Sequence, residues 1–249
     1  DDDDEDIEDE KVSAAECVCL VSAFEGPLAM LLATGTDPGM RERVMIGLGR
    51  LSLVDEKTAL KYLPALVNAS VTALEQLPVR AAAFQAITDI ALLFDSAATA
   101  LRDPKNFMDL PGVAIFCEED SSTPAAGGNF VVGMIKTLLC CANDDGNCHL
   151  TSMVSLVAER AAKLILSKRL ISVQSSEGTC TQDEEVATVL DALLVAYFNP
   201  PKMKDDNEST DSGKINVMSD LEAAKALGSM ARMQQVLSVF FPAFATAIS

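Results

Sequence analysis

The apolar positions of this chain recur at three- and four-residue steps, which is the period of one helix face. Segment 78–94 shows the pattern most clearly. Its apolar face consists of Val79, Ala83, Ala86, Ile87, Ile90 and Phe94. The segment begins at Pro78, a residue favoured in a first helical turn because its missing N–H would be unpaired there. The preceding segment, 56–75, repeats the pattern, carries Pro64 within its apolar face and follows Asp55, a candidate N-cap.

The same periodicity predicts further helices along the chain, whereas the alternation typical of strands is nearly absent. The expected helices are 12–33, 41–54, 56–75, 78–94, 130–142, 150–166, 183–198 and 220–247. We expect the first to be kinked or divided at Gly26-Pro27, and the last to be capped by Ser219 and bent at Pro242. Two polar stretches, 96–128 and 199–218, are predicted to be long loops.

Two internal similarities indicate a repeat. A shift of 39 positions places segment 79–93 on segment 40–54, with matching apolar residues. A shorter echo relates Tyr62-Leu63-Pro64-Ala65-Leu66 to Phe240-Phe241-Pro242-Ala243-Phe244. Helix pairs that repeat every 40–47 residues or so are typical of HEAT and armadillo arrays. We therefore predict an all-α fold, a HEAT-repeat α-solenoid of stacked antiparallel helix pairs, over residues 12–249.

Composition agrees with a helical core but excludes a broadly basic surface. Of 249 residues, 49% are hydrophobic and only 5% aromatic, which suits stacked helices better than a sheet. The net charge is −18, and nine acids lie within residues 1–10. Like charges repel one another, so we predict a disordered acidic linker at 1–11, with an arm for histones or other basic partners as the alternative. Such a chain is not a general electrostatic DNA binder.

Other features favour a soluble, intracellular context. No signal peptide is visible, and the longest apolar run, 236–248, is too short to cross a bilayer. Seven cysteines without a framework spacing fit reduced thiols. The chain begins at Asp1 rather than at a methionine, and we expect it to be a piece of a longer array.

A search for catalytic or metal-binding patterns favours a protein that is not an enzyme and needs no cofactor. Cys140, Cys141, Cys148 and His149 are the residues that could form a zinc site. Adjacent cysteines on a helix point about 100° apart, and buried thiols are the favoured interpretation. A Cys148–His149 nucleophile pair is less favoured still, because sequence neighbours do not face each other on a helix. The glycine-rich phosphate-binding and nucleophile-elbow motifs are absent.

Two groups of residues are candidate binding or regulatory positions. The densest basic cluster comprises Arg160, Lys163, Lys168 and Arg169. These four are candidate DNA contacts, although an ordinary solvated helix face is the favoured alternative; Arg41, Arg43 and Arg50 form a second such group. Ser122 and Thr123 follow Glu118-Glu119-Asp120 and precede Pro124, so they are candidate phosphorylation sites.

Several blocks of the sequence, in order, resemble a known family. They are Met40-Arg41-Glu42-Arg43, Leu48-Gly49, Val54-Asp55, Tyr62-Leu63-Pro64, Val79-Arg80, Asp89-Ile90, Tyr197-Phe198-Asn199-Pro200 and Gln235-Val236-Leu237-Ser238-Val239-Phe240-Phe241-Pro242-Ala243-Phe244-Ala245. The chain is similar over residues 14–247 to the C-terminal conserved region of condensin complex subunit 3, the G-type HEAT subunit. The last block is the most specific.

The resemblance implies a non-catalytic scaffold. It implies that the chain binds the kleisin subunit of condensin, contributes to clamping double-stranded DNA through the whole complex, and meets the SMC ATPase subunits indirectly. It also implies a role in mitotic chromosome condensation, on chromosomes in the nucleus with a possible cytoplasmic pool, and no membrane partner. The alternative is a HEAT or armadillo adaptor of another kind, such as a transport receptor or a phosphatase scaffold.

Overall fold

A computed structural model describes the chain over residues 14–35, 37–72, 75–110, 130–144, 148–170, 181–198 and 220–248. These residues form helices and no strand. The helices are α1 (Ala14–Thr34), α2 (Pro38–Ser52), α3 (Glu56–Val71), α4 (Leu77–Leu93), α5 (Asp95–Arg102), α7 (Phe130–Asp144), α8 (Cys148–Leu166), α9 (Thr181–Phe198) and α10 (Asp220–Ile248), with a 3₁₀ turn, η1, at Pro104–Asn106. The predicted all-α solenoid is confirmed.

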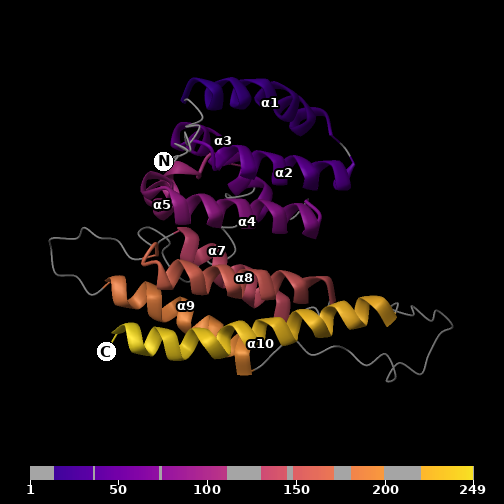
Figure 1. The fold of residues 1–249 in the computed structure, drawn as a ribbon. Coiled ribbons are helices and arrows are strands. Elements are labelled where there is room, and N and C mark those ends of the chain that lie inside the picture. The colour runs from indigo at the N-terminus through magenta and orange to yellow at the C-terminus, as the bar shows by residue number, and fades with distance from the viewer. Residues whose placement is uncertain are drawn as a thin grey trace, which may run out of the picture.

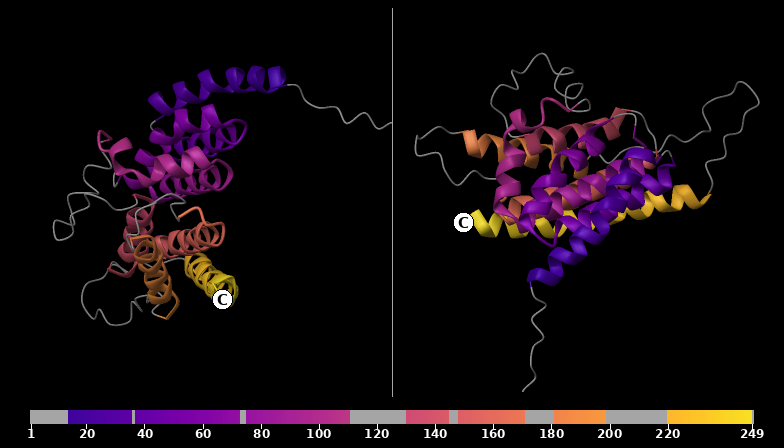
Figure 2. Two further views of the ribbon diagram at one scale, coloured as in Figure 1. Left: turned by 90° about the vertical axis from the view of Figure 1, so that its left-hand side faces the viewer. Right: turned by 90° about the horizontal axis from the view of Figure 1, so that it is seen from above.

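The helices stack in two rows (Figure 1). One row, called row B, places α2 against α4, α4 against α8, and α8 against α10. The other, row A, contains α1, α3, α5, α7 and α9, of which α3 contacts α5, α5 contacts α7, and α7 contacts α9. In both views of Figure 2, α7 and α9 lie on one side of the array and α8 and α10 on the other. The described helices therefore form four pairs that stack along one axis, and α5 is an additional short helix in row A.

Local sequence signals fix where α2 and α3 begin. Asp37 caps α2 by accepting a hydrogen bond from the backbone N–H of Met40 at 2.8 Å, and Pro38 occupies the first turn. Asp55 caps α3 through the backbone N–H of Thr58 at 3.0 Å, as its position before the helix predicted. The Thr58 hydroxyl hydrogen-bonds the same carboxylate and is the main reason that the pKa of Asp55 is lowered.

The core of row B is tightest where α2 crosses α4. Met45 and Leu48 of α2 and Phe84 of α4 are completely buried. A β-carbon added to Gly49 would lie 2.6 Å from that of Ala86, so the two helices approach more closely than larger residues would allow. These helices are the pair related by the shift of 39 positions, and the structure places them as neighbours in one row. The sequence repeat therefore corresponds to a structural one.

The proline echo, in contrast, does not relate equivalent positions. Pro64 lies in α3 of row A, whereas Pro242 lies in α10 of row B. The aromatic residues that precede them, Tyr62 and Phe240, are both buried. The shared motif therefore reflects a buried aromatic side chain in each helix. It does not mark equivalent positions in successive repeats.

Polar contacts join α1 to the rest of the array. The Tyr62 hydroxyl donates to the Glu25 carboxylate at 2.7 Å, and burial together with this carboxylate raises the pKa of Tyr62 to about 12. Arg41 bonds the Glu75 carboxylate, with Nε 3.0 Å from Oε2, and reaches the carbonyl oxygens of Leu32 and Gly35 at the end of α1. Arg41 is thus a structural link rather than a free surface cation.

The predicted boundaries need one correction. Residues 96–128 were expected to form a loop, but residues 95–102 form α5 and residues 104–106 a 3₁₀ turn. Ala97, Ala98 and Leu101 are buried there, so three small or apolar residues suffice to attach this short amphipathic helix to row A. The rest of that stretch beyond residue 110, the predicted loop 199–218 and the predicted linker 1–11 lie outside the described residues.

Candidate partner-binding face

Row B and row A carry different charge. Among residues whose side chains the structure describes, the helices of row B carry seven lysines and arginines against three acids, and those of row A four against four. Row B is therefore the positively charged side of a strongly acidic chain.

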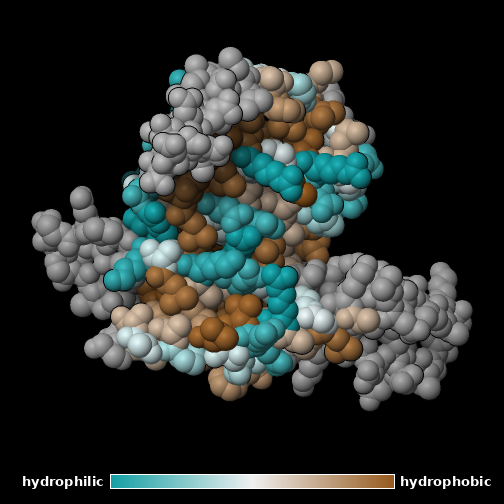
Figure 3. Space-filling view, viewed as in Figure 1, coloured by the Kyte–Doolittle hydropathy of each residue, from teal (hydrophilic) through white to brown (hydrophobic). Residues whose placement is uncertain are grey.

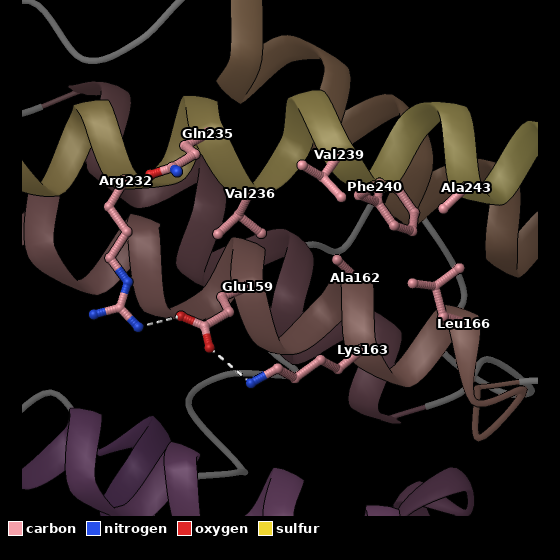
Figure 4. Close-up of a pocket in the computed structure, with 10 residues that line it drawn as sticks. All are labelled: Glu159, Ala162, Lys163, Leu166, Arg232, Gln235, Val236, Val239, Phe240 and Ala243. Carbon is pink, nitrogen blue, oxygen red and sulfur yellow. Dashed lines mark hydrogen bonds and ion pairs between the residues drawn. The ribbon is translucent and has the colours of Figure 1, made fainter.

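A groove of about 430 Å³ lies between α8 and α10 of row B. Its apolar part is lined by Ala162, Leu166, Val236, Val239, Phe240 and Ala243. Ala162 and Phe240 form a buried floor, whereas Leu166 and Val239 are 44% and 68% exposed at the rim. Figure 4 shows these side chains facing one another across the two helices. Hydrophobic side chains also gather over this part of the face in the space-filling view (Figure 3).

One end of the groove is charged, and a single carboxylate holds two cations there. Glu159 accepts hydrogen bonds from Lys163 Nζ on its own helix and from Arg232 Nη2 on α10, both at 2.7 Å (Figure 4). The hydrogen bond from Lys163 is the main reason that the pKa of Glu159 is lowered, and Arg232 adds to it. Because Lys163 and Arg232 are about half and two-thirds exposed, this end presents a net positive charge to solvent.

Glu159 and Arg232 also border a second, polar hollow of about 640 Å³ between α4, α8 and α10. Its other lining residues are Gln85, Ser155, Leu156, Arg160, Gly228 and Ser229. The two hollows thus meet at the Glu159–Arg232 pair. The surface between α8 and α10 is apolar on one side of this pair and polar on the other.

The four predicted DNA contacts do not form one free basic patch. Arg160 pairs with Asp89 of α4, Arg169 pairs with Asp95 of α5, and Lys163 pairs with Glu159. The ion pairs of Arg160 and Arg169 hold the stacked helices together. Lys168 is exposed, and no ion pair engages it in the described part of the chain. DNA contact by these four residues remains a prediction.

Lys168 adopts a backbone conformation that is unusual for lysine. Its φ is 59°, and among the described residues other than glycine no second positive φ occurs. The N–H of Arg169 bonds the carbonyl of Leu164, and the N–H of Lys168 bonds that of Ile165, both at 2.9 Å. This is the Schellman arrangement that ends α8, and glycine is the residue that ordinarily occupies the position of Lys168.

Arg43 and Arg50 of the second basic group are exposed on α2, one heptad apart. No ion pair engages either of them within the described residues. Together with Lys168 they are cations of row B and its margin that remain available to a negatively charged partner.

The remaining predicted site residues cannot be placed in a site. Ser122 and Thr123 lie outside the described residues. Cys140, Cys141, Cys148 and His149 belong to α7 and α8, but their side chains are also outside the described set. Where side chains are described, no group of three histidine, cysteine or acidic residues could hold a metal ion. None of the described helices has the length and apolar character needed to cross a membrane.

Sequence reasoning missed the groove. A signal was present, because Val236, Val239, Phe240 and Ala243 recur at steps of three and four along α10. In the sequence they predict a helix and belong to the most specific block of the resemblance, but they do not predict a groove. Neither the pattern nor the charges of Glu159 and Arg232 could show that α8 and α10 are neighbours across 73 residues of sequence.

A stacked array of helix pairs that exposes one long row, with a groove along it, defines a helical-repeat scaffold. The comparisons identify its family. The chain belongs to the nuclear condensing complex subunits, and the model of the C-terminal domain of that family matches residues 32–248. The resemblance to condensin complex subunit 3 is therefore confirmed, and chromosome condensation in the nucleus is the process to which the family belongs. Comparison with curated proteins and with solved structures found no match.

Proposed function

We propose that this chain is a non-catalytic scaffold of a condensin complex, and that row B binds the kleisin subunit. The observation that carries the proposal is the groove between α8 and α10, an exposed apolar surface on the positively charged row. Exposed apolar grooves with a polar rim are typical of sites where a partner chain binds. The SMC ATPase subunits would then be reached through kleisin rather than directly.

The proposal is tested by calorimetry with the central segment of the kleisin partner. We expect a dissociation constant in the micromolar range or tighter, about −8 kcal/mol or more favourable. Absence of binding by a sample that circular dichroism shows to be folded and helical would contradict it. Binding of a Ran-type GTPase or of a phosphatase subunit instead would favour the adaptor alternative.

We further propose that the chain contributes to clamping double-stranded DNA through the assembled complex, using exposed cations of row B and its margin. Arg43, Arg50 and Lys168 support this, because no ion pair engages them in the described part of the chain. Each phosphate contact that is lost lowers the slope of log affinity against log salt by about 0.9. Glutamine at all three positions should therefore reduce that slope in the assembled complex, and an unchanged slope would count against this contribution.

A further inference from the structure

The groove between α8 and α10 has two chemically different ends, and their order along the helices is fixed. Leu166, Val239 and Ala243 lie toward one end and Arg232 toward the other, and the Lys163 side chain extends from the middle of α8 toward Glu159 at the Arg232 end (Figure 4). Val239 and Arg232 are seven residues apart on α10, which is two helical turns, or about 10.5 Å. A ligand that fills the groove must therefore be apolar at one end and complementary to positive charge about 10 Å away.

The charged end is not neutralised within the described structure. Lys163 and Arg232 share the one carboxylate of Glu159, and Arg232 stays 67% exposed while doing so. Both cations reach Glu159 from the rim, so each has donors directed at solvent. A second carboxylate, supplied by a ligand, would complete the pairing.

We infer that this groove docks an amphipathic segment of the partner chain. The segment carries large aliphatic or aromatic side chains for the Leu166–Val239 end and an acidic residue for the Arg232–Lys163 end. In a helical segment these groups would be about seven residues apart, and in an extended one about three. The inference rests on the proposed function, which supplies kleisin as the partner, and it adds where the partner docks and which chemistry the groove selects.

Other occupants fit the groove less well. DNA is disfavoured, because the Glu159 carboxylate lies between the two cations and the adjoining wall of the groove is apolar. The acidic segment 1–10 of this chain could meet the cations, but it contains one apolar residue, Ile7, and cannot fill the apolar end. A second copy of the chain is the remaining occupant, and sedimentation tests it.

The experiment is calorimetric titration of the whole chain with the central kleisin segment, using two charge-introducing variants. Val239→Asp places a carboxylate at the apolar end, and Val195→Asp is its matched control on α9 of row A. Both valines are exposed, at 68% and 41%, so neither change should unfold the array. Arg232→Glu reverses the charged end, and Lys136→Glu, at an exposed position on α7 of row A, is its control.

We expect Val239→Asp to weaken binding at least tenfold and Arg232→Glu to weaken it several-fold with a smaller salt dependence. The controls on α9 and α7 should stay within about twofold of the wild type. Wild-type affinity in both groove variants would overturn the inference and leave the proposed function intact. No binding by the wild type would overturn both. Self-association of the wild type that Val239→Asp abolishes in sedimentation would assign the groove to a second copy and overturn the inference.

Discussion

Row A and row B come from the same helix pairs, yet they differ in charge and in how their helices are joined. Among the described side chains of their helices, row A carries four acids against four bases, and row B three against seven. On row B, Arg160 joins α8 to Asp89 of α4, and Arg232 joins α10 to Glu159 of α8. On row A, the described ion pair between helices that flank one another is Lys61–Glu25, and Lys61 is 61% exposed.

The difference shows how a chain with a charge of −18 can still offer a positive surface. Each helix pair places one helix in each row, so stacking gathers the excess cations of α2 and α8 on row B. The net charge of the chain governs its solubility and non-specific binding, whereas the local charge of each row determines which partner can bind there. The comparison can be tested by substitutions that act on one row and not on the other.

The largest effect is expected at Gly49, where α2 and α4 approach most closely. Valine there should lower the free energy of unfolding by about 3 kcal/mol, because its β-carbon would overlap that of Ala86. Gly228→Ala on α10 is the control. Nothing lies within 4 Å of its added carbon, so it should raise stability by up to about 1 kcal/mol. Urea unfolding measures both, and an unaffected Gly49→Val variant would show that the close approach is not required.

The next effect concerns the ion pairs between stacked helices. Arg160→Leu should lower the free energy of unfolding by about 2 kcal/mol, since it leaves the Asp89 carboxylate unpaired beside a largely buried position. Lys61→Leu, the row A counterpart, should cost clearly less because Lys61 faces solvent. Thermal and urea unfolding of the two variants give the comparison. Equal losses of unfolding free energy would show that the ion pairs within the two rows contribute equally to stability.

A smaller, stabilising effect is expected at the end of α8. Lys168→Gly should raise the free energy of unfolding by about 0.5–1 kcal/mol, because glycine adopts a positive φ without steric cost. Lys136→Gly, within α7 of row A, is the matched control and should lower it by about 1 kcal/mol. Loss of stability on Lys168→Gly would mean that the lysine side chain contributes more than its backbone costs.

The smallest effect is the contribution of Glu159 at acid pH. Its folded-state pKa lies below the ordinary value of 4.5, so the unfolded chain takes up a proton first as the pH falls. The stabilisation is therefore present above about pH 4.5 and is lost as the pH drops through the folded pKa. Glu159→Gln should lower stability at pH 7 by less than about 1 kcal/mol, with a smaller difference near pH 3. An equal loss at both pH values, measured by urea unfolding, would contradict this.

Much of the fold followed from local patterns. Asp55 and Pro78 marked helix starts, and the periodic apolar residues of 78–94 marked the face that packs. α5 was missed because eight residues with three buried side chains give too short a period to read. The candidate site was harder to predict: Arg160 and Arg169 were identified as surface cations, but their carboxylate partners lie 71 and 74 residues away in sequence.

The sequence by itself therefore determined the helices other than α5, their pairing and the repeat that relates α2 to α4. Those properties depend on apolar spacing and capping residues within a few turns, and on similarity between segments. Only the tertiary structure decided which charges are neutralised, which remain exposed, and that α8 and α10 enclose a groove. Ion pairs and grooves arise between helices that are distant in the chain, and their geometry depends on how the rows stack.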